Sequence, residues 1–218
     1  MSLVEDIYSL IFSIPITPKD FYKFYRISRG YVNIFWRKLS TIRCPGVDNN
    51  IIEFILHRVI NLKILDLSHA DFMTTDGFRY LPPTLRTCSI DCNHRITDKI
   101  FKYLPLTIKN LWLGQCYNIT DFGLKNLPTT LQILTLTICQ NFPDISLKYL
   151  PPTLKILTLL RCETFRDSVL DDLPVSLETL NLCWCCKITD HKIEEVSKKI
   201  CVNIYENWDE CVIKTTIE

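Results

Sequence analysis

The chain has 218 residues, 47% of them hydrophobic, and its 25 basic and 24 acidic residues leave a formal net charge of +1. The hydrophobic content is enough to bury a large core, whereas near neutrality argues against a surface that binds nucleic acid or an anionic membrane. No apolar run approaches the roughly 18 residues that a membrane-spanning helix needs. Composition therefore favours a protein that binds other proteins.

The segment 1–38 differs from the rest of the chain and is expected to form short helices, because its apolar residues are helically spaced. The apolar stretch near the start follows Glu5 and Asp6 instead of basic residues, and no small-residue cleavage site follows it. It is therefore expected to be a folded helix and not a secretion signal. Four short motifs occur in order: LVEDIYSLIFS (3–13), PKDF (18–21), ISRGY (27–31) and WRKL (36–39).

These motifs resemble the F-box, whose pattern is roughly L-P-x-E-I-x-x-x-I-F, then P-x-D-L, V-x-R-x-W and L-W-x-x-L leading into leucine-rich repeats. Val4 and Tyr31 replace a proline and a tryptophan of that pattern, and the stretch from Tyr31 to Trp36 is shorter. The resemblance implies that an apolar patch docks the Skp-type adaptor of a cullin-RING ubiquitin ligase. The residues implied in adaptor binding are Leu3, Ile7, Ile11, Phe12, Pro18 and Phe21. The alternative is that residues 1–38 only cap the first repeat of a solenoid.

Residues 39–205 repeat with a period of 23 residues, which predicts a solenoid of stacked turns. An apolar triplet L-x-x-L-x-L keeps its phase through six clear copies, and Leu-Pro recurs five times at the same spacing. The Leu-Pro pairs begin at Leu81, Leu104, Leu127, Leu150 and Leu173. Degenerate copies are expected at both ends, as capping turns. Their triplets would be Leu39, Ile42 and Cys44 at one end and Ile200, Asn203 and Tyr205 at the other.

Each repeat is expected to contain one strand and one short helix. The alternating apolar pattern of LQILTL (131–136) predicts a strand with Leu134 and Leu136 pointing inward, and stacking of such strands gives a parallel sheet. The I-T-D sequence, or a relative of it, predicts a helix start at which the Asp acts as a cap. The Pro of Leu-Pro ends that helix after one to two turns.

Period, triplet, cysteine and Thr-Asp together resemble the cysteine-containing leucine-rich repeat, L-x-x-L-x-L-x-x-C-x-x-I-T-D followed by a helix, from Leu39 to Tyr205. The resemblance implies an α/β leucine-rich-repeat solenoid with a parallel sheet on its concave face and short helices on its convex face. The repeats are shorter than in that subtype, and their L-P-x-T-L punctuation is similar to bacterial-effector and amoebal repeats. Richness in Ile, Lys, Asn and Tyr is typical of an AT-rich genome, such as that of a large virus or an amoeba-associated bacterium, whose product would act in the host cell cytoplasm.

The eleven cysteines would indicate disulfides in a small secreted protein. Four of them instead fall one repeat apart, at Cys116, Cys139, Cys162 and Cys185. There a thiol is expected to pack as a small hydrophobe and to donate weakly to loop carbonyls, a role that Asn93 would fill one repeat earlier. Reduced thiols indicate a cytoplasmic or nuclear protein.

The concave face is the expected binding surface for a protein partner, because side chains flanking the buried leucines point into it and few of them are charged. Trp and Arg are enriched at interface hot spots. The residues expected to contact the partner are Trp112, Ile133, Thr135, Ile156, Thr158, Leu160, Arg161 and Trp184. The alternative for Trp112 and the threonines is that they only stabilise cross-strand packing. Charged residues just before the strands, among them Lys63, Arg86 and Lys109, are expected to form a solvated strip.

No motif predicts a metal, a cofactor or a catalytic site. CWCC (183–186) contains one C-x-x-C, whereas zinc needs four converging ligands. The histidines have no matching nucleophile motif and no glycine-rich phosphate loop occurs. A nucleophilic thiol at Cys183 or Cys186 is the remaining enzymatic hypothesis, and slow thiol reactivity would count against it.

The sequence thus predicts three segments: an F-box-like part (1–38), the solenoid (39–205), and a carboxyl cap or tail (206–218) in which Trp208 covers the last turn. The predicted function is that of a non-catalytic adaptor that binds a protein substrate for an SCF-type ubiquitin ligase. The alternative is a repeat scaffold that binds a protein partner without any link to a ligase.

Overall fold

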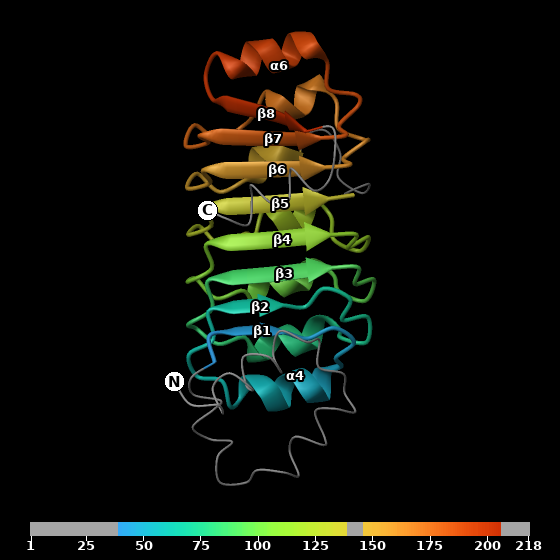
Figure 1. The fold of residues 1–218 in the computed structure, drawn as a ribbon, viewed down its shortest axis with the longest axis vertical. Coiled ribbons are helices and arrows are strands. Elements are labelled where there is room, and N and C mark those ends of the chain that lie inside the picture. Colours follow the sequence, from blue (N-terminus) through green and yellow to red (C-terminus); the bar gives the residue numbers. More distant parts are fainter. Residues whose placement is uncertain (1–38, 139–145, 206–218) are drawn as a thin grey trace, which may run out of the picture.

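The described part of the chain is one parallel sheet of eight strands, arranged in sequence order, with the helices on one side of it (Figure 1). The structure is a computed structural model, and it describes residues 39–138 and 146–205. The strands are β1 (Thr41–Arg43), β2 (Ile64–Asp66), β3 (Thr87–Asp91), β4 (Asn110–Gly114), β5 (Ile133–Thr137), β6 (Ile156–Leu160), β7 (Thr179–Cys183) and β8 (Cys201–Tyr205). The helices are α4 (Asn49–Leu56), α5 (Asp121–Leu124) and α6 (Asp190–Ser197), and the 3₁₀ helices are η1 (Thr75–Tyr80), η2 (Asp98–Lys102), η3 (Ser146–Tyr149) and η4 (Asp167–Leu170).

The core is a strip of leucines that follows directly from the period of the sequence. From β1 to β7 each residue of a strand pairs with the residue one full repeat further along the chain, so that Leu111 lies beside Leu134 and Leu134 beside Leu157. These side chains are fully buried or nearly so. The α/β solenoid predicted from the repeat is confirmed, with each turn burying its apolar residues against the next.

The short helices begin where I-T-D predicts, but the Asp has a different role. Thr120 and Thr189 are the N-caps of α5 and α6, and each hydroxyl accepts a hydrogen bond from a backbone amide of its own helix. The Asp is the first helical residue, and in η2 and η4 it contacts the following turn. Asp98 accepts hydrogen bonds from the Thr120 amide and hydroxyl, both at 2.7 Å. The prediction that the Asp caps its own helix is therefore wrong, because its carboxylate links consecutive turns.

The Thr of L-P-x-T-L also ties each turn to the one before it. The hydroxyl of Thr130 donates to the carbonyls of Leu106, at 2.7 Å, and Ile108, at 2.9 Å. Equivalent bonds are made by Thr84, Thr107, Thr153 and Ser176. The punctuation of the repeat therefore supplies hydrogen bonds to backbone carbonyls that no strand or helix satisfies.

The thiols of the cysteine column lie against backbone carbonyls as predicted, but these carbonyls belong to strand residues and not to loops. The thiols of Cys116, Cys162 and Cys185 lie 3.1–3.7 Å from carbonyl oxygens of their own turn and the preceding one. The Asn93 amide donates to the carbonyls of Ala70 and Met73 at 2.8 and 3.0 Å. Cys139 lies outside the described residues. None of the nine cysteines in the described part of the chain forms a disulfide.

The last strand departs from the period by a single position. β8 pairs with β7 one position short of a full repeat, which sets Ile204 beside Leu182 and Tyr205 beside Cys183. Of the predicted core triplet, Ile200 packs against the core as expected, whereas the assignment of Asn203 and Tyr205 to the core is wrong. Because side chains alternate between faces, the shift moves Tyr205 to the side of the sheet opposite the core leucines. Ile204 takes the core position instead and is 60% exposed at the end of the stack.

Candidate interaction surface

The candidate site is the face of the sheet that points away from the helices, which we call the front face. Figure 1 views the sheet from this side, and it corresponds to the concave face of the sequence prediction. The strand register sets Trp112 beside Thr135, Thr135 beside Thr158, and Ile133 beside Ile156. These predicted contact residues are therefore direct neighbours on β4, β5 and β6.

The front face carries an apolar cluster of its own, separate from the main core. Leu160, Cys183 and Tyr205 lie side by side on β6, β7 and β8, and none of them is more than 6% exposed. Trp112 packs against this cluster from β4. The leucines of the main core lie on the other side of the same strands. Towards the carboxyl end of the solenoid both faces of the sheet therefore carry buried apolar side chains.

Polar residues beside this cluster are buried as well. Thr135, Thr158 and Asn181 are 3%, 0% and 4% exposed. The Asn181 amide donates to the Thr158 hydroxyl at 3.0 Å, and the Asn203 amide donates to the Asn181 side-chain carbonyl at 2.9 Å. In the same column near the amino end, Asp66 remains partly exposed. The threonines that were expected to line an open surface thus lie on the front face but are shielded from solvent.

The rim at the carboxyl ends of the strands contains a repeated left-handed residue. Six residues, one per turn, have φ between 48° and 60°. They are His69, Cys92, Gln115, Ile138, Arg161 and Trp184. The amide of Ile138 donates to Leu160 O and that of Arg161 to Cys183 O, both at 2.8 Å. The left-handed residue thus continues the hydrogen-bond ladder while it turns the chain away from the sheet. Gly46, one repeat before His69, has the same left-handed backbone, with φ 67°. Sequence reasoning missed the column because this backbone favours glycine, and the six later members are not glycine.

Two predicted contact residues meet on this rim. The guanidinium of Arg161 lies 4.2 Å from the centre of the Trp184 ring, and Trp184 is 38% exposed. Such a cation–π contact at an exposed site contributes about 0.5–1 kcal/mol. The pair is therefore held together at the edge of the front face and remains accessible to a partner.

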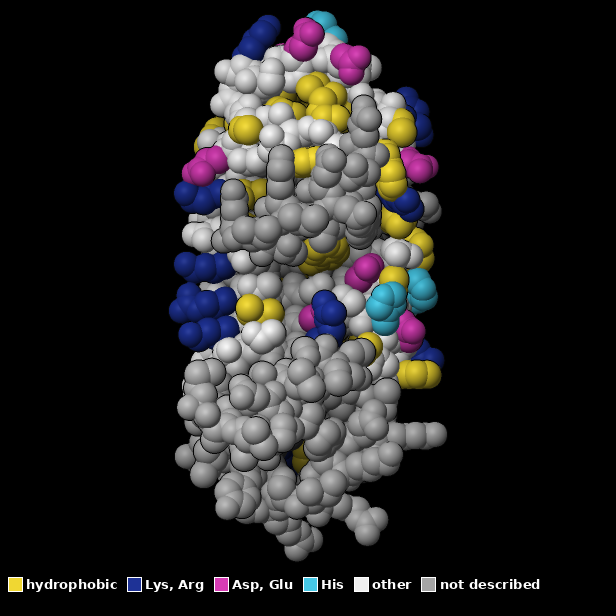
Figure 2. All heavy atoms as spheres, in the orientation of Figure 1, with side chains coloured by type: hydrophobic (Ala, Val, Ile, Leu, Met, Phe, Trp, Pro, Cys, Tyr) yellow, Lys and Arg dark blue, Asp and Glu magenta, His cyan; other side chains and the backbone are white. Residues whose placement is uncertain are grey.

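A basic strip runs along the opposite rim, at the amino ends of β2 to β4. Lys63, Arg86 and Lys109 are exposed and follow the strand spacing of about 4.8 Å, and Figure 2 shows Lys and Arg side chains gathered along this edge. Within the described residues no ion pair joins these three to an acidic side chain, whereas Lys155 pairs with Glu178 at 2.8 Å. The strip is exposed to solvent, as predicted. Among the described ion pairs, an acidic side chain neutralises Lys155 but none neutralises Lys63, Arg86 or Lys109.

The two thiols named as possible nucleophiles differ in accessibility, since Cys183 is buried and Cys186 is exposed. Several other described thiols have raised pKa values. Burial raises the pKa of Cys44 and of Cys88 to about 12, and that of Cys92 to about 11. A hydrogen bond with Cys162 raises the pKa of Cys185 further. Thiols with such pKa values are protonated at neutral pH. Within residues 39–138 and 146–205 no three His, Cys, Asp or Glu side chains converge as a metal site, and no helix is long and apolar enough to cross a membrane.

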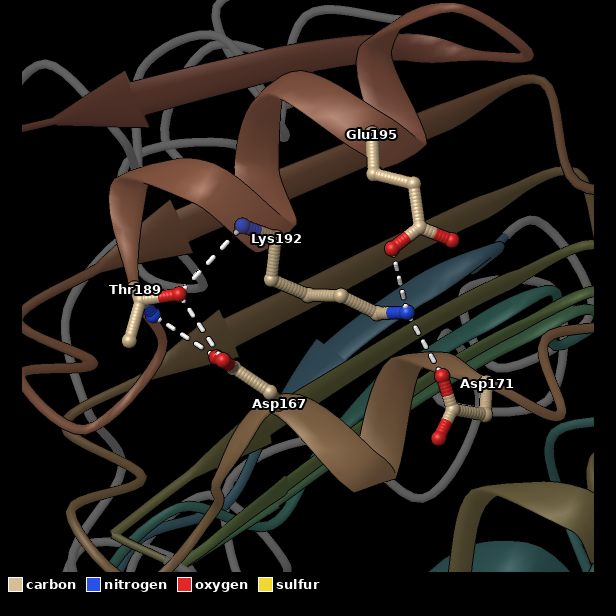
Figure 3. A network of polar contacts seen from close by, with 5 residues as sticks. All are labelled: Asp167, Asp171, Thr189, Lys192 and Glu195. Carbon is tan, nitrogen blue, oxygen red and sulfur yellow. Dashed lines mark hydrogen bonds and ion pairs between the residues drawn. The ribbon is translucent and has the colours of Figure 1, made fainter.

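A polar network on the helix side fastens the last turn to the one before it (Figure 3). The ammonium of Lys192, a residue only 8% exposed, lies 2.6 Å from Asp171 Oδ1 and 2.9 Å from Glu195 Oε2. The Asp171 carboxylate, followed by that of Glu195, raises the pKa of Lys192. The Thr189 amide and hydroxyl donate to Asp167 and lower its pKa. These contacts form a clamp that joins the last turn to the one before it.

The six residues implied in adaptor binding, and Trp208, lie outside the described residues. Their predicted roles remain predictions. They are Leu3, Ile7, Ile11, Phe12, Pro18 and Phe21.

Comparison with known proteins identifies the class of fold. No family model matches the chain, and no curated protein matches it. The structure is similar to a chain of the yeast Rad7–Elc1 complex, with a TM-score of 0.61 and 15% identity over 78% of this chain and 50% of that chain. This protein thus spans about half the length of its match. CroV588, a circular leucine-rich-repeat protein, matches with a TM-score of 0.44 and 18% identity over 70% of this chain and 25% of that chain. The chain has an α/β solenoid fold of the leucine-rich-repeat type.

Proposed function

We propose that this protein is a non-catalytic adaptor of an SCF-type ubiquitin ligase. In this proposal residues 1–38 dock a Skp-type adaptor and the front face binds the protein to be ubiquitinated. The observation that carries the proposal is the order of four F-box-like motifs immediately before the solenoid, ending at WRKL (36–39), where β1 follows at Thr41. An F-box followed directly by leucine-rich repeats is the arrangement that these motifs resemble.

The fold supports the proposal at a coarser level. The Rad7 structure, to which this solenoid is similar, contains a second protein, Elc1. A solenoid of this type can therefore take part in a complex with another protein. That likeness concerns the fold, so the choice of a Skp-type adaptor depends on the amino-terminal motifs of this chain.

The rim of the front face supports the substrate-binding half of the proposal. Trp184 and Arg161 are exposed next to the apolar cluster of Leu160, Cys183 and Tyr205. Exposed Trp and Arg beside apolar residues have the composition of an interface hot spot.

The experiment is co-purification of the full chain with a eukaryotic Skp-type adaptor. A double variant, Ile11→Asp and Phe12→Asp, is expected to lose the adaptor while its circular dichroism spectrum stays that of the solenoid. The control is Val175→Asp, the same type of change at a fully exposed residue, which is expected to retain the adaptor. Failure of the unaltered, folded protein to bind would reduce residues 1–38 to a cap of the solenoid. A repeat scaffold without a ligase would then be the better description.

A further inference from the structure

We propose that residues 206–218 of this chain occupy the front face of β5 to β8 and compete there with the protein partner. The inference rests on the proposed partner-binding function of that face and adds its regulation. The segment, ENWDECVIKTTIE, lies outside the described residues, whereas the surface that it would cover lies within them.

The front face of β6 and β7 is shielded from solvent. Leu160 and Cys183 are 1% and 0% exposed, and Thr158 beside them is 0% exposed. The described helices lie on the other side of the sheet (Figure 1). All-parallel sheets commonly have both faces covered, whereas Asp66 and Ser89 on the front face near the amino end are still partly accessible. The carboxyl half of the front face therefore needs an occupant.

The described chain ends next to this shielded surface. Tyr205 is the last residue of β8, and the shift of that strand by a single position turns its side chain to the front face, where it packs on Leu160 and Cys183. The following thirteen residues can span up to about 43 Å when extended. The distance from β8 to β4 is four strand spacings, about 19 Å. The segment begins beside the apolar cluster and is long enough to reach Trp112.

The residues of the segment are chemically complementary to the front face. The segment carries apolar residues that can pack on the cluster, and acidic residues near its start. The apolar residues are Trp208, Val212, Ile213 and Ile217, and the acidic ones are Glu206, Asp209 and Glu210. Arg161 is exposed on the rim of the same face and offers a cation to those carboxylates. A segment of the same chain also has a high effective concentration at this surface, so an outside partner would have to displace it.

The test uses the thiol of Cys183, which lies under the proposed occupant. The full chain is compared with a full-length variant carrying Val212→Asp and Ile213→Asp, and alkylation by iodoacetamide is followed residue by residue by mass spectrometry. In the variant, Cys183 is expected to react faster by about tenfold or more. Cys88, buried in the main core behind the sheet, is the internal control and is expected to stay protected in both chains. Equal rates at Cys183 in the two chains would overturn the proposal.

A second measurement decides the case in which the substitutions disturb more than the segment. A synthetic peptide with the sequence of residues 206–218 is added to the variant. Restored protection of Cys183 supports the proposal, and unchanged reactivity at saturating peptide overturns it in favour of a cap over the end of the solenoid. Adaptor binding through residues 1–38 is measured on the same variant. Its loss or retention tests the ligase function separately, because the altered residues lie at the other end of the chain.

Discussion

Replacement of Thr130 by Val tests whether the Thr of L-P-x-T-L stabilises the stack by the hydrogen bonds described above. Val has nearly the same shape, so the change removes the hydroxyl that donates to Leu106 O and Ile108 O. Leu106 is 73% exposed, and its carbonyl can bind water instead, whereas the bond to Ile108 is partly buried. The expected loss is one net hydrogen bond plus part of the cost of an unsatisfied carbonyl, about 1–2 kcal/mol.

The neighbouring residue provides the matched control for this prediction. Thr129 is exposed, and the hydroxyl that bonds the preceding turn at this point of the repeat is that of Thr130, so Thr129→Val is expected to change stability by less than about 0.5 kcal/mol. Urea unfolding followed by circular dichroism gives both free energies of unfolding, and about 1–2 kcal/mol corresponds to a Tm lower by roughly 2–8 °C in a chain of this size. Equal stability of the two variants would refute the role assigned to the ladder.

Two further predictions concern the core and the clamp of the last turn. Leu134→Ala is expected to cost about 2–5 kcal/mol because Leu134 is fully buried, and exposed Leu106→Ala, expected to be near neutral, is the control in the same urea experiment. Asp167 has a lowered pKa, so its contribution is present above its ordinary pKa and is lost as the pH falls through the lowered value, below about pH 4. Tm measured against pH is therefore expected to fall less in Asp167→Asn than in the unaltered chain, and Asp172→Asn, which alters an exposed acid of the same turn, is the control variant.

The parallel sheet could be predicted from the sequence period because burial of the repeated leucines determines how the turns stack. A leucine that recurs once per repeat can be buried only if each turn stacks in register on the next, and the cysteine and asparagine positions followed from the same alignment. The side-chain ladders were harder to predict. The repeat of Thr130 and Asp98 was visible, but the atoms that they contact belong to another turn, and only the folded chain brings them together.

Other features left no pattern to detect. A left-handed residue is ordinarily signalled by glycine, but the rim has bulky residues there, including the β-branched Ile138. The register shift of β8 was not predicted because the last copy of the repeat is degenerate. Its apolar residues match the repeat pattern almost equally well at a spacing of one full repeat and at a spacing one residue shorter. Burial of Thr135 and Thr158 depends on what covers the sheet, and a rule that assigns alternate residues to the two faces contains no information on that.

The front face is not uniform along its length, and this bears on how a protein partner would bind. Near β2 and β3 it is polar and accessible, with Asp66 and Ser89 partly exposed beside the basic strip of Lys63, Arg86 and Lys109. Near β6 to β8 it is apolar and shielded. Charges on the accessible end set the rate and salt dependence of association more than its strength, whereas apolar area contributes about 25 cal/mol per Å² once it is buried by the partner. A partner would therefore contact the amino-terminal end of the front face first. Its affinity would depend on whether it can also displace what covers the apolar cluster on β6 to β8.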